Sequence, residues 1–293
     1  MTTTIPTPRD PVGEDNDQTG ESDGRPRRRW VRRAAVGAAI LLVVVGVAGA
    51  IIVWGGSDSR PVTLGEAGGR LRSATTLAPE PAVLRPPQGV YLYRGGGVDR
   101  LSTPPKEQVE GPDMPATVTH RSDGCWTFRI DYHSNHWQTW DFCPRDGGME
   151  EEGGTTYQKW DFGVFVSEST TTFKCESSIT VRAEQQPGDE WTQTCSGDGG
   201  PAEERGLSTG PYRFIGNEDL EIGGTKVAAL HYVRNRTMSG GQRGTERSDV
   251  WFAAADGMPL RNDRHLEVRT DTFVGEVTYN EDATFELTSL IPG

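Results

Sequence analysis

Residues 125–143 read CWTFRIDYHSNHWQTWDFC, and this stretch decides the fold class. If the chain turns back at Ser134, Cys125 lies opposite Cys143, and successive side chains alternate between the two faces of a hairpin. One face then carries six large apolar side chains: Trp126, Phe128, Ile130, Tyr132, Trp140 and Phe142. The other face is polar, so a slip of register by one residue would bury charges. The stretch therefore predicts an antiparallel hairpin with one face in a core.

The same alternation recurs from Val90 onward, and turn residues interrupt it about every ten positions. Residue pairs that tolerate positive φ predict two-residue turns at Asp123–Gly124, Gly223–Gly224 and Asp256–Gly257. The polar residues 280–282 predict a further turn. We therefore expect a mainly β domain over 89–292, folded as an antiparallel, curved meander sheet or a half-barrel, without a long amphipathic helix.

Four cysteines, Cys125, Cys143, Cys175 and Cys195, allow three pairings. Hairpin geometry favours Cys125–Cys143, and a second hairpin centred on Gln185 favours Cys175–Cys195. The sequence contains no Cys-x-x-Cys motif, so structural disulfides are favoured over a redox pair or a zinc site. Such disulfides indicate an oxidising compartment.

A membrane span is predicted at residues 34–54, which read AAVGAAILLVVVGVAGAIIVW and contain no charged side chain. A helix of this length rises ~31 Å, enough to cross the apolar layer of a bilayer. Arginines crowd residues 25–33, so the positive-inside rule places residues 1–33 in the cytoplasm, as a disordered tail, and the rest outside. We expect a single-pass protein of the cell membrane with the bilayer as its first partner.

A cleaved export signal is the competing interpretation, because Ala48-Gly49-Ala50 has the small-x-small form of a signal-peptidase site. The apolar run continues to Trp54, beyond the usual length of a signal core, which favours a retained anchor. Cleavage after Ala50 stays open at this stage.

Proline content and net charge predict the arrangement of residues 55–88 and exclude one class of binding partner. Several prolines in residues 55–88 predict a semi-stiff stalk between the membrane and the β domain. The formal net charge of −12 repels phosphate backbones, so no nucleic-acid partner is expected.

The candidate catalytic and metal-binding motifs are weak. His133 and His136 form His-x-x-His beside two aspartates, but they straddle the expected hairpin tip and would point in different directions, which favours a polar turn over a metal site. The three glutamates of residues 150–152 predict a solvated loop in preference to a calcium site. Residues 95–97, Gly-Gly-Gly, lack the Lys-Ser/Thr of a phosphate loop, and no Gly-x-Ser-x-Gly is present. We therefore expect no catalytic residue, metal or cofactor.

Tryptophan is the one residue type with a hint of function. The candidate ligand-binding residues are Trp137, Trp140, Trp160 and Trp251. The simpler interpretation is that they pack in the core across neighbouring strands. The sharper one is a concave aromatic surface that receives an amphiphile or a sugar. Trp137 falls on the polar face of the first hairpin, so it is expected to be the most exposed.

A hairpin near the C-terminus carries a family resemblance. Val250-Trp251-Phe252, followed by Asp256-Gly257-Met258-Pro259-Leu260-Arg261, resembles the hairpin of lipoprotein-carrier-like (LolA-type) half-barrels and their actinobacterial relatives. The resemblance covers residues 212–291 and implies a curved antiparallel sheet whose concave face shelters acyl chains beneath helices. Such helices are not evident here. The layout as a whole resembles uncharacterised actinobacterial membrane-anchored proteins.

These features lead to three functional hypotheses. The first is a non-enzymatic, membrane-anchored cell-envelope module that binds an amphiphile, such as a lipid, or another envelope component. The second is an extracytoplasmic protein-interaction or sensor domain. The third is an enzyme, which would need His133, His136 and nearby carboxylates to converge in a cleft. An enclosed apolar cavity would favour the first hypothesis.

Overall fold

The computed structural model describes residues 58–73, 84–146, 148–199, 205–272 and 275–293. The elements in these residues are helix α2 (Leu64–Ser73) and strands β1 (Gly89–Ser102), β2 (Pro105–Glu110), β3 (Asp113–His120), β4 (Trp126–His133), β5 (His136–Arg145), β6 (Gly148–Asp161), β7 (Val166–Val181), β8 (Glu190–Gly199), β9 (Gly206–Ile222), β10 (Thr225–Gly240), β11 (Arg243–Ala253), β12 (Pro259–Thr272) and β13 (Gly275–Leu287).

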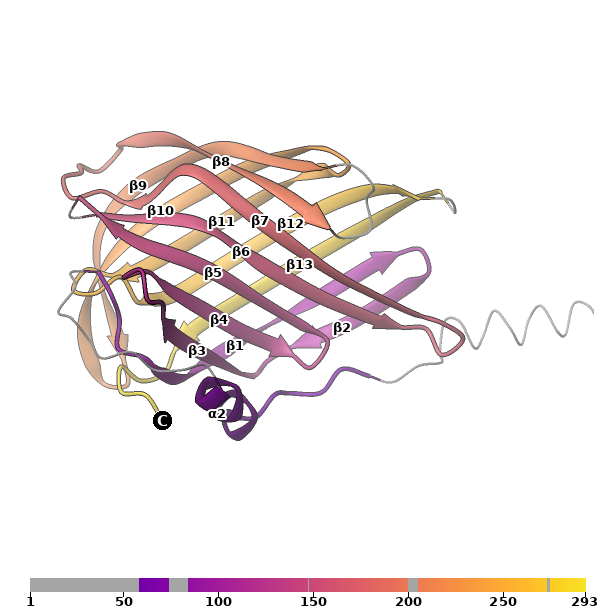
Figure 1. Ribbon diagram of the computed structural model, residues 1–293, viewed down its shortest axis with the longest axis horizontal. Coiled ribbons are helices and arrows are strands. Elements are labelled where there is room, and N and C mark those ends of the chain that lie inside the picture. The colour runs from indigo at the N-terminus through magenta and orange to yellow at the C-terminus, as the bar shows by residue number, and fades with distance from the viewer. Residues whose placement is uncertain (1–57, 74–83, 147, 200–204, 273–274) are drawn as a thin grey trace, which may run out of the picture. The chain divides into compact units, whose positions relative to one another are not determined.

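The strands form one antiparallel meander that closes on itself (Figure 1). From β3 to β13 each strand pairs with the next, and β1 pairs with β13 to close the barrel. Strands β2 and β3 pair with successive halves of β1 and are separated by Gly111, which has a φ of 72°. Because β2 and β3 lie one after the other along the same edge of β1, they count as one strand position, and the thirteen strands form a closed barrel of 12 positions.

The expected antiparallel meander is confirmed, whereas the half-barrel alternative is wrong because β1 and β13 meet. Residues Gly95 and Gly97 make that seam possible. A Cβ atom on Gly95 would overlap the backbone carbonyl of Thr284, and one on Gly97 would overlap that of Asp282. The glycine run therefore allows β1 and β13, the two strands that close the barrel, to approach each other closely.

The hairpin of β9 and β10 covers one end of the barrel. Its register shifts between His231 and Tyr232, and beyond this bulge the hairpin bends across the barrel end, at the left of Figure 1. Ile222 and Ala229 in the bent part are buried in the core. We call this the cap end, and the end that holds the Ser134–Asn135 turn the far end.

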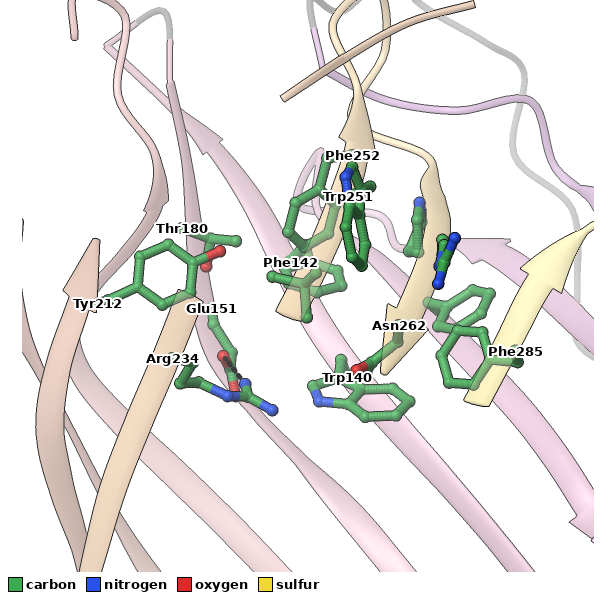
Figure 2. Close-up of a pocket in the computed structure, with 14 residues that line it drawn as sticks. Trp140, Phe142, Glu151, Thr180, Tyr212, Arg234, Trp251, Phe252, Asn262 and Phe285 are labelled. Atoms are coloured by element: carbon green, nitrogen blue, oxygen red, sulfur yellow. Dashed lines mark ion pairs between the residues drawn. The ribbon is translucent and has the colours of Figure 1, made fainter. Parts of the chain in front are cut away.

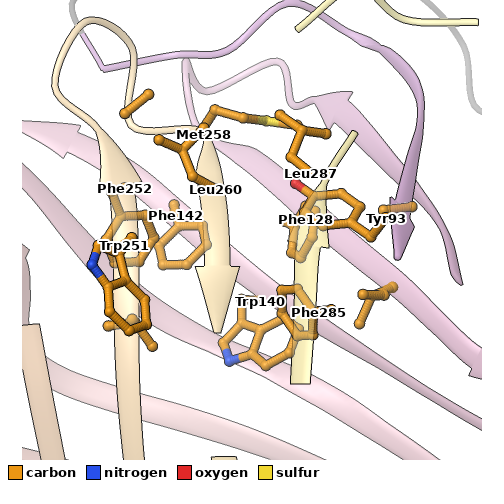
Figure 3. Close-up of a cluster of buried hydrophobic side chains, with 14 of the residues drawn as sticks. Tyr93, Phe128, Trp140, Phe142, Trp251, Phe252, Met258, Leu260, Phe285 and Leu287 are labelled. Atoms are coloured by element: carbon orange, nitrogen blue, oxygen red, sulfur yellow. The ribbon is translucent and has the colours of Figure 1, made fainter. Parts of the chain in front are cut away.

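The hydrophobic core lies toward the cap end and is mainly aromatic. Figure 3 shows the rings of Phe128, Trp140, Phe142 and Phe285 packed between β4, β5 and β13. Phe285 meets the ring of Tyr93 edge to face, with 5.4 Å between ring centroids. Aromatic rings bury large areas and favour this offset or edge-on packing.

The segment before β1 packs on the barrel, so the predicted stalk is wrong for residues 58–73 and 84–88. Helix α2 lies outside against β1 and β3, where Ala67 is fully buried and Arg70 forms an ion pair with Asp131 (Figure 1). Leu84 is buried, and its carbonyl accepts a hydrogen bond from the indole of Trp126 at 3.1 Å. Apolar residues among the prolines therefore anchor this chain to the core.

The predicted cytoplasmic tail (1–33) and membrane span (34–54) lie outside the described residues. Among the residues that are described, no helix combines the length and apolar character that crossing a membrane requires.

Both predicted disulfides are present, Cys125–Cys143 and Cys175–Cys195. The first hairpin has the expected register, with Trp126 opposite Phe142. The two-residue turn at Gly223–Gly224 is confirmed, whereas Asp123–Gly124 and Asp256–Gly257 lie within five-residue connections, 121–125 and 254–258. The turn predicted at residues 280–282 is wrong, because these residues lie inside β13.

Replacing Cys175 and Cys195 together by alanine is expected to lower the free energy of unfolding by about 3 kcal/mol, because the bridge closes a short loop in the unfolded chain. The two residues are 20 positions apart in the sequence. Urea unfolding of the full chain, followed by tryptophan fluorescence, measures the loss. An equal stability of the double variant and the oxidised protein would contradict the prediction.

Candidate functional site

A continuous run of polar side chains crosses the barrel interior, and each member lies within 3.6 Å of the next. We call it the interior polar chain. In order, its members are Gln193, Arg236, Glu151, Arg234, Glu246, Arg264, Glu281, Tyr279, Asp99, His136 and Glu110, with His133 joined to Asp99. Its members come from strands β1, β2, β4, β5, β6, β8, β10, β11, β12 and β13.

The arginine half of the interior polar chain pairs each guanidinium group with carboxylates. Arg234 donates to Glu246 at 2.6 Å, and Arg264 donates to Glu281 at 2.9 Å. Burial would raise the pKa of Glu246, but the charges of the arginines, Arg234 foremost, outweigh burial and hold this pKa well below its usual range. Glu246 therefore stays ionised, and these ion pairs link β10 to β13 from the inside.

The histidine half converges on Asp99. Its Oδ2 atom lies 3.2 Å from Nε2 of His133 and 3.0 Å from Nδ1 of His136, while its Oδ1 atom accepts from the hydroxyl of Tyr279 at 2.7 Å. Glu110 approaches from β2, with Oε1 at 3.5 Å from Nδ1 of His136. Asp99, Glu110, His133 and His136 are each at most 2% exposed.

Burial and neighbouring charge shift the titration of this half in different directions. Burial raises the pKa of Glu110 to about 8, and the charges of Asp99 and Glu281 act in the same direction. Burial would lower the pKa of His136, but the surrounding carboxylates, Asp99 foremost, raise it to about 10. Burial would also raise the pKa of Asp99, yet His136 and His133 hold it well below its usual range. At neutral pH a protonated His136 therefore faces an ionised Asp99.

The expectation that His133 and His136 point in different directions is wrong. The β4–β5 register is the predicted one up to Asp131 opposite Trp137, and then it shifts so that His133 pairs with His136. Residues paired directly across an antiparallel hairpin project from the same face. The bulge at Tyr132 thus turns both imidazoles inward, where a regular hairpin would have placed His133 outside.

A small apolar cavity lies above the arginine half (Figure 2). Trp140, Phe142 and Phe285 line it, and Figure 2 shows Glu151 and Arg234 on its other side. Its volume of about 30 Å³ holds on the order of two water molecules. The cavity is therefore far too small for an acyl chain.

The four candidate tryptophans do not share one concave surface. Trp140 and Trp251 line the cavity, and Trp160 packs edge to face against Tyr279. Trp137 is half-buried on the outer face, stacked on Tyr157 at 5.4 Å and covered by the guanidinium of Arg129 at 3.9 Å. A role in ligand binding stays a prediction for all four.

The outer wall near the cap end is hollowed into a groove of about 580 Å³ between the tip of the β9–β10 hairpin and strands β12, β13 and β1. We call it the outer groove. Its charged lining residues are Arg94, Glu221, Arg261, Asp263 and Glu286. Arg261 is held in place by Asp263 at 2.7 Å and by the ring of Trp251, whose centroid is 4.9 Å from the guanidinium carbon.

Sequence reasoning missed Asp99, Glu110 and Glu281 as site residues. Each lies in a strand at a position that shares the inward face with buried neighbours; in β13, Glu281 alternates with Ala283 and Phe285. For Asp99 and Glu281 this shared parity with apolar residues was the available signal, whereas Glu110 shares its parity in β2 with the polar Gln108.

Comparison with known proteins adds little. No protein-family model and no curated protein matches the chain. Among solved structures, the crystal structure of the hypothetical lipoprotein YmcC from Escherichia coli K12 is similar at 10% identity, over 78% of this chain and 98% of that one, with a TM-score of 0.31. A TM-score this low carries no conclusion about fold or function.

Proposed function

We propose that the chain is a non-enzymatic, membrane-anchored module of the cell envelope that binds a neutral, polyhydroxylated envelope component in the outer groove. The observation that carries the proposal is the groove itself, whose volume of about 580 Å³ falls in the range of small-molecule sites. Anchoring rests on the apolar residues 34–54 of the sequence.

The filled interior supports a ligand site outside the barrel. An amphiphile of the kind that the sequence suggested would need room for its acyl chain, and the inner cavity offers about 30 Å³. Aromatic side chains such as Phe128 and Phe285 occupy the space where such a chain would lie (Figure 3). Storage of an acyl chain would therefore require the core to unpack.

The charges of the outer groove favour a neutral ligand with many hydroxyl groups. Two guanidinium groups and three carboxylates line the groove, which gives it a net charge of about −1 and disfavours anionic headgroups. Planar carboxylate and guanidinium groups can each form two hydrogen bonds to adjacent hydroxyls. Sugars of the cell envelope present such hydroxyls, so a glycan is the ligand class that fits best.

Replacing Arg261 by glutamine is expected to weaken binding of a glycan at least ~10-fold, because the variant loses a charge-assisted donor worth about 1.5–3 kcal/mol. Isothermal titration of the full chain with chitooligosaccharides and with maltooligosaccharides measures the change. The matched control is Arg269→Gln, since Arg269 is an exposed arginine outside the groove, paired with Glu267.

Two results would contradict the glycan proposal. One is that neither family of oligosaccharide binds the unmodified chain. The other is that both variants bind as the unmodified chain does, which would place the ligand elsewhere on the surface.

A protein-interaction role is the second candidate, and one observation favours it. Arg129, Trp137 and Tyr157 form a stacked ladder on the outer face of β4, β5 and β6. Arginine, tryptophan and tyrosine are the residue types that dominate binding energy at protein interfaces. Crosslinking to a membrane partner that Trp137→Ala abolishes, and Arg261→Gln does not, would support this role over glycan binding.

A further inference from the structure

The histidine half of the interior polar chain contains a carboxyl group that the rest of the fold does not satisfy. Glu110 is 2% exposed, and neither of its oxygens has a hydrogen-bond partner in the described part of the chain. The same holds for Nε2 of His136. Burying a carboxyl without a partner costs several kcal/mol, even when it is protonated. The fold retains this group beside two imidazoles and a second carboxylate, and its nearest cationic group is His136, with 3.5 Å between Oε1 and Nδ1.

The donor atoms around Glu110 have the spacing of metal ligands. Atoms Oδ2 of Asp99, Nδ1 of His136 and Oε1 of Glu110 follow one another at 3.0 and 3.5 Å, and Nε2 of His133 lies 3.2 Å from Asp99. Two ligands of a tetrahedral ion with bonds of ~2.0–2.1 Å are separated by ~3.3–3.4 Å. The observed distances bracket that value, and the ligand atoms of Asp99, His133 and His136 all lie within 4.8 Å of one another.

The charge of the interior also suits a divalent cation. Five inward carboxyl groups have side chains at most 7% exposed: Asp99, Glu110, Glu151, Glu246 and Glu281. Three guanidinium groups, at most 8% exposed, oppose them: Arg234, Arg236 and Arg264. With all eight groups ionised and His136 neutral, as binding of an ion would require, the difference is two negative charges. One divalent cation would balance it, and buried charge is stable only when it is balanced.

Hydrogen bonds from neighbouring groups determine which atom of each side chain could coordinate a metal ion. The Tyr279 hydroxyl donates to Oδ1 of Asp99 at 2.7 Å, and Oδ2 lies between the two imidazoles, where it would face an ion once they release the protons that point at it. The backbone N–H of Asn135 donates to Nδ1 of His133 at 3.2 Å, so the proton of this imidazole lies on Nε2. His133 therefore joins an ion only after its proton moves to Nδ1 and this long hydrogen bond is lost. His136 would likewise give up the Nδ1 proton that faces Asp99 and keep its Nε2 proton, and Glu110 would bind as the carboxylate.

We propose that Asp99, Glu110 and His136 bind a divalent transition-metal ion of the zinc class inside the far end of the barrel, with His133 as the fourth ligand after tautomer exchange. The ligand set of imidazole nitrogens and carboxylate oxygens is the one that such ions accept. The ion ties β1, β2 and β5 together next to the His133–His136 hairpin tip. This inference is independent of the glycan proposal, because the outer groove involves none of these residues.

The test uses the full chain without a polyhistidine tag, produced in medium supplemented with zinc and purified in detergent. Elemental analysis is expected to find about one zinc ion per chain, and removal of zinc with a chelator is expected to lower the melting temperature. Loading the chelated protein with Co²⁺ in place of zinc is expected to give the visible absorption band of a four-coordinate site. These measurements do not depend on any activity.

The Glu110→Gln variant tests whether Glu110 binds the metal ion or is only a buried carboxyl group. The substitution keeps the shape and removes the acid, so it leaves the melting temperature of the metal-free protein unchanged or higher. If Glu110 is a ligand, the same variant binds zinc at least ~10-fold more weakly and loses most of the zinc-dependent rise in melting temperature. His265→Gln is the matched control, because His265 is an exposed histidine paired with Asp282 at 2.6 Å.

Three outcomes would overturn the proposal. The first is a zinc content below about one ion in ten chains both after supplemented growth and after refolding with zinc under oxidising conditions. The second is a zinc content that Glu110→Gln leaves unchanged. The third is a zinc content that falls equally in His265→Gln, which would assign the ion to surface histidines.

Discussion

Replacing Arg264 by methionine is expected to lower the free energy of unfolding by about 3–5 kcal/mol, because it leaves buried carboxylates without their partner. Arg264 donates to Glu281 at 2.9 Å and to Gln138 at 2.8 Å, and its Nε atom lies 3.4 Å from Glu246. Its side chain is 8% exposed, so water cannot take its place. Guanidinium chloride unfolding of the full chain measures the loss.

Two further variants decide whether the loss comes from unpaired charge. Arg269→Met removes an exposed arginine, 52% exposed and paired with Glu267, and is expected to cost at most about 1 kcal/mol. Adding Glu281→Gln to Arg264→Met is expected to recover part of the stability, because the stranded charge is then neutral. A cost below about 1 kcal/mol for Arg264→Met would mean that the interior polar chain is hydrated and does not hold the barrel together.

Local pairing explains which parts of the fold the sequence predicts. In the hairpin of residues 125–143, the alternation of apolar and polar side chains specifies the register. Its strands and the Cys125–Cys143 bridge therefore follow from the sequence. The two-residue turn at Gly223–Gly224 follows from two residues that tolerate positive φ. Closure does not follow, because the β1–β13 seam joins residues almost 200 positions apart, such as Tyr93 and Leu287.

The candidate site was misread for one physical reason. Residues 280–282, 150–152 and the His133–His136 pair are polar runs, and each was interpreted as a turn or a solvated loop. In the structure Glu281 and Glu151 lie in strands and face inward, at most 6% exposed. Their partners are supplied by other strands, as Arg234 and Arg236 supply those of Glu151. Alternation identifies an inward face only when that face is apolar, and here the barrel is wide enough to bury a balanced set of charges.

Replacing Phe285 by alanine is expected to lower the free energy of unfolding by about 3–5 kcal/mol, the range for deleting a buried ring. Phe285 is 3% exposed and packs against Tyr93 at 5.4 Å and Phe128 at 6.4 Å between ring centroids. It also lines the small apolar cavity, so its removal would enlarge an existing void that the rigid barrel wall cannot collapse. The cost should therefore lie toward the upper end of the range.

The matched control is Phe165→Ala at the far-end turn between β6 and β7, where the ring is 47% exposed and stacks on Phe162. Its expected cost is below about 1 kcal/mol. If the Phe285→Ala cavity is dry and apolar, as its neighbours indicate, benzene should bind there and raise the melting temperature of that variant alone. A similar loss of stability in both phenylalanine variants, with no response to benzene, would show that the interior repacks. Acyl chains could then be admitted after all, and the ligand would have to be sought inside the barrel as well as in the outer groove.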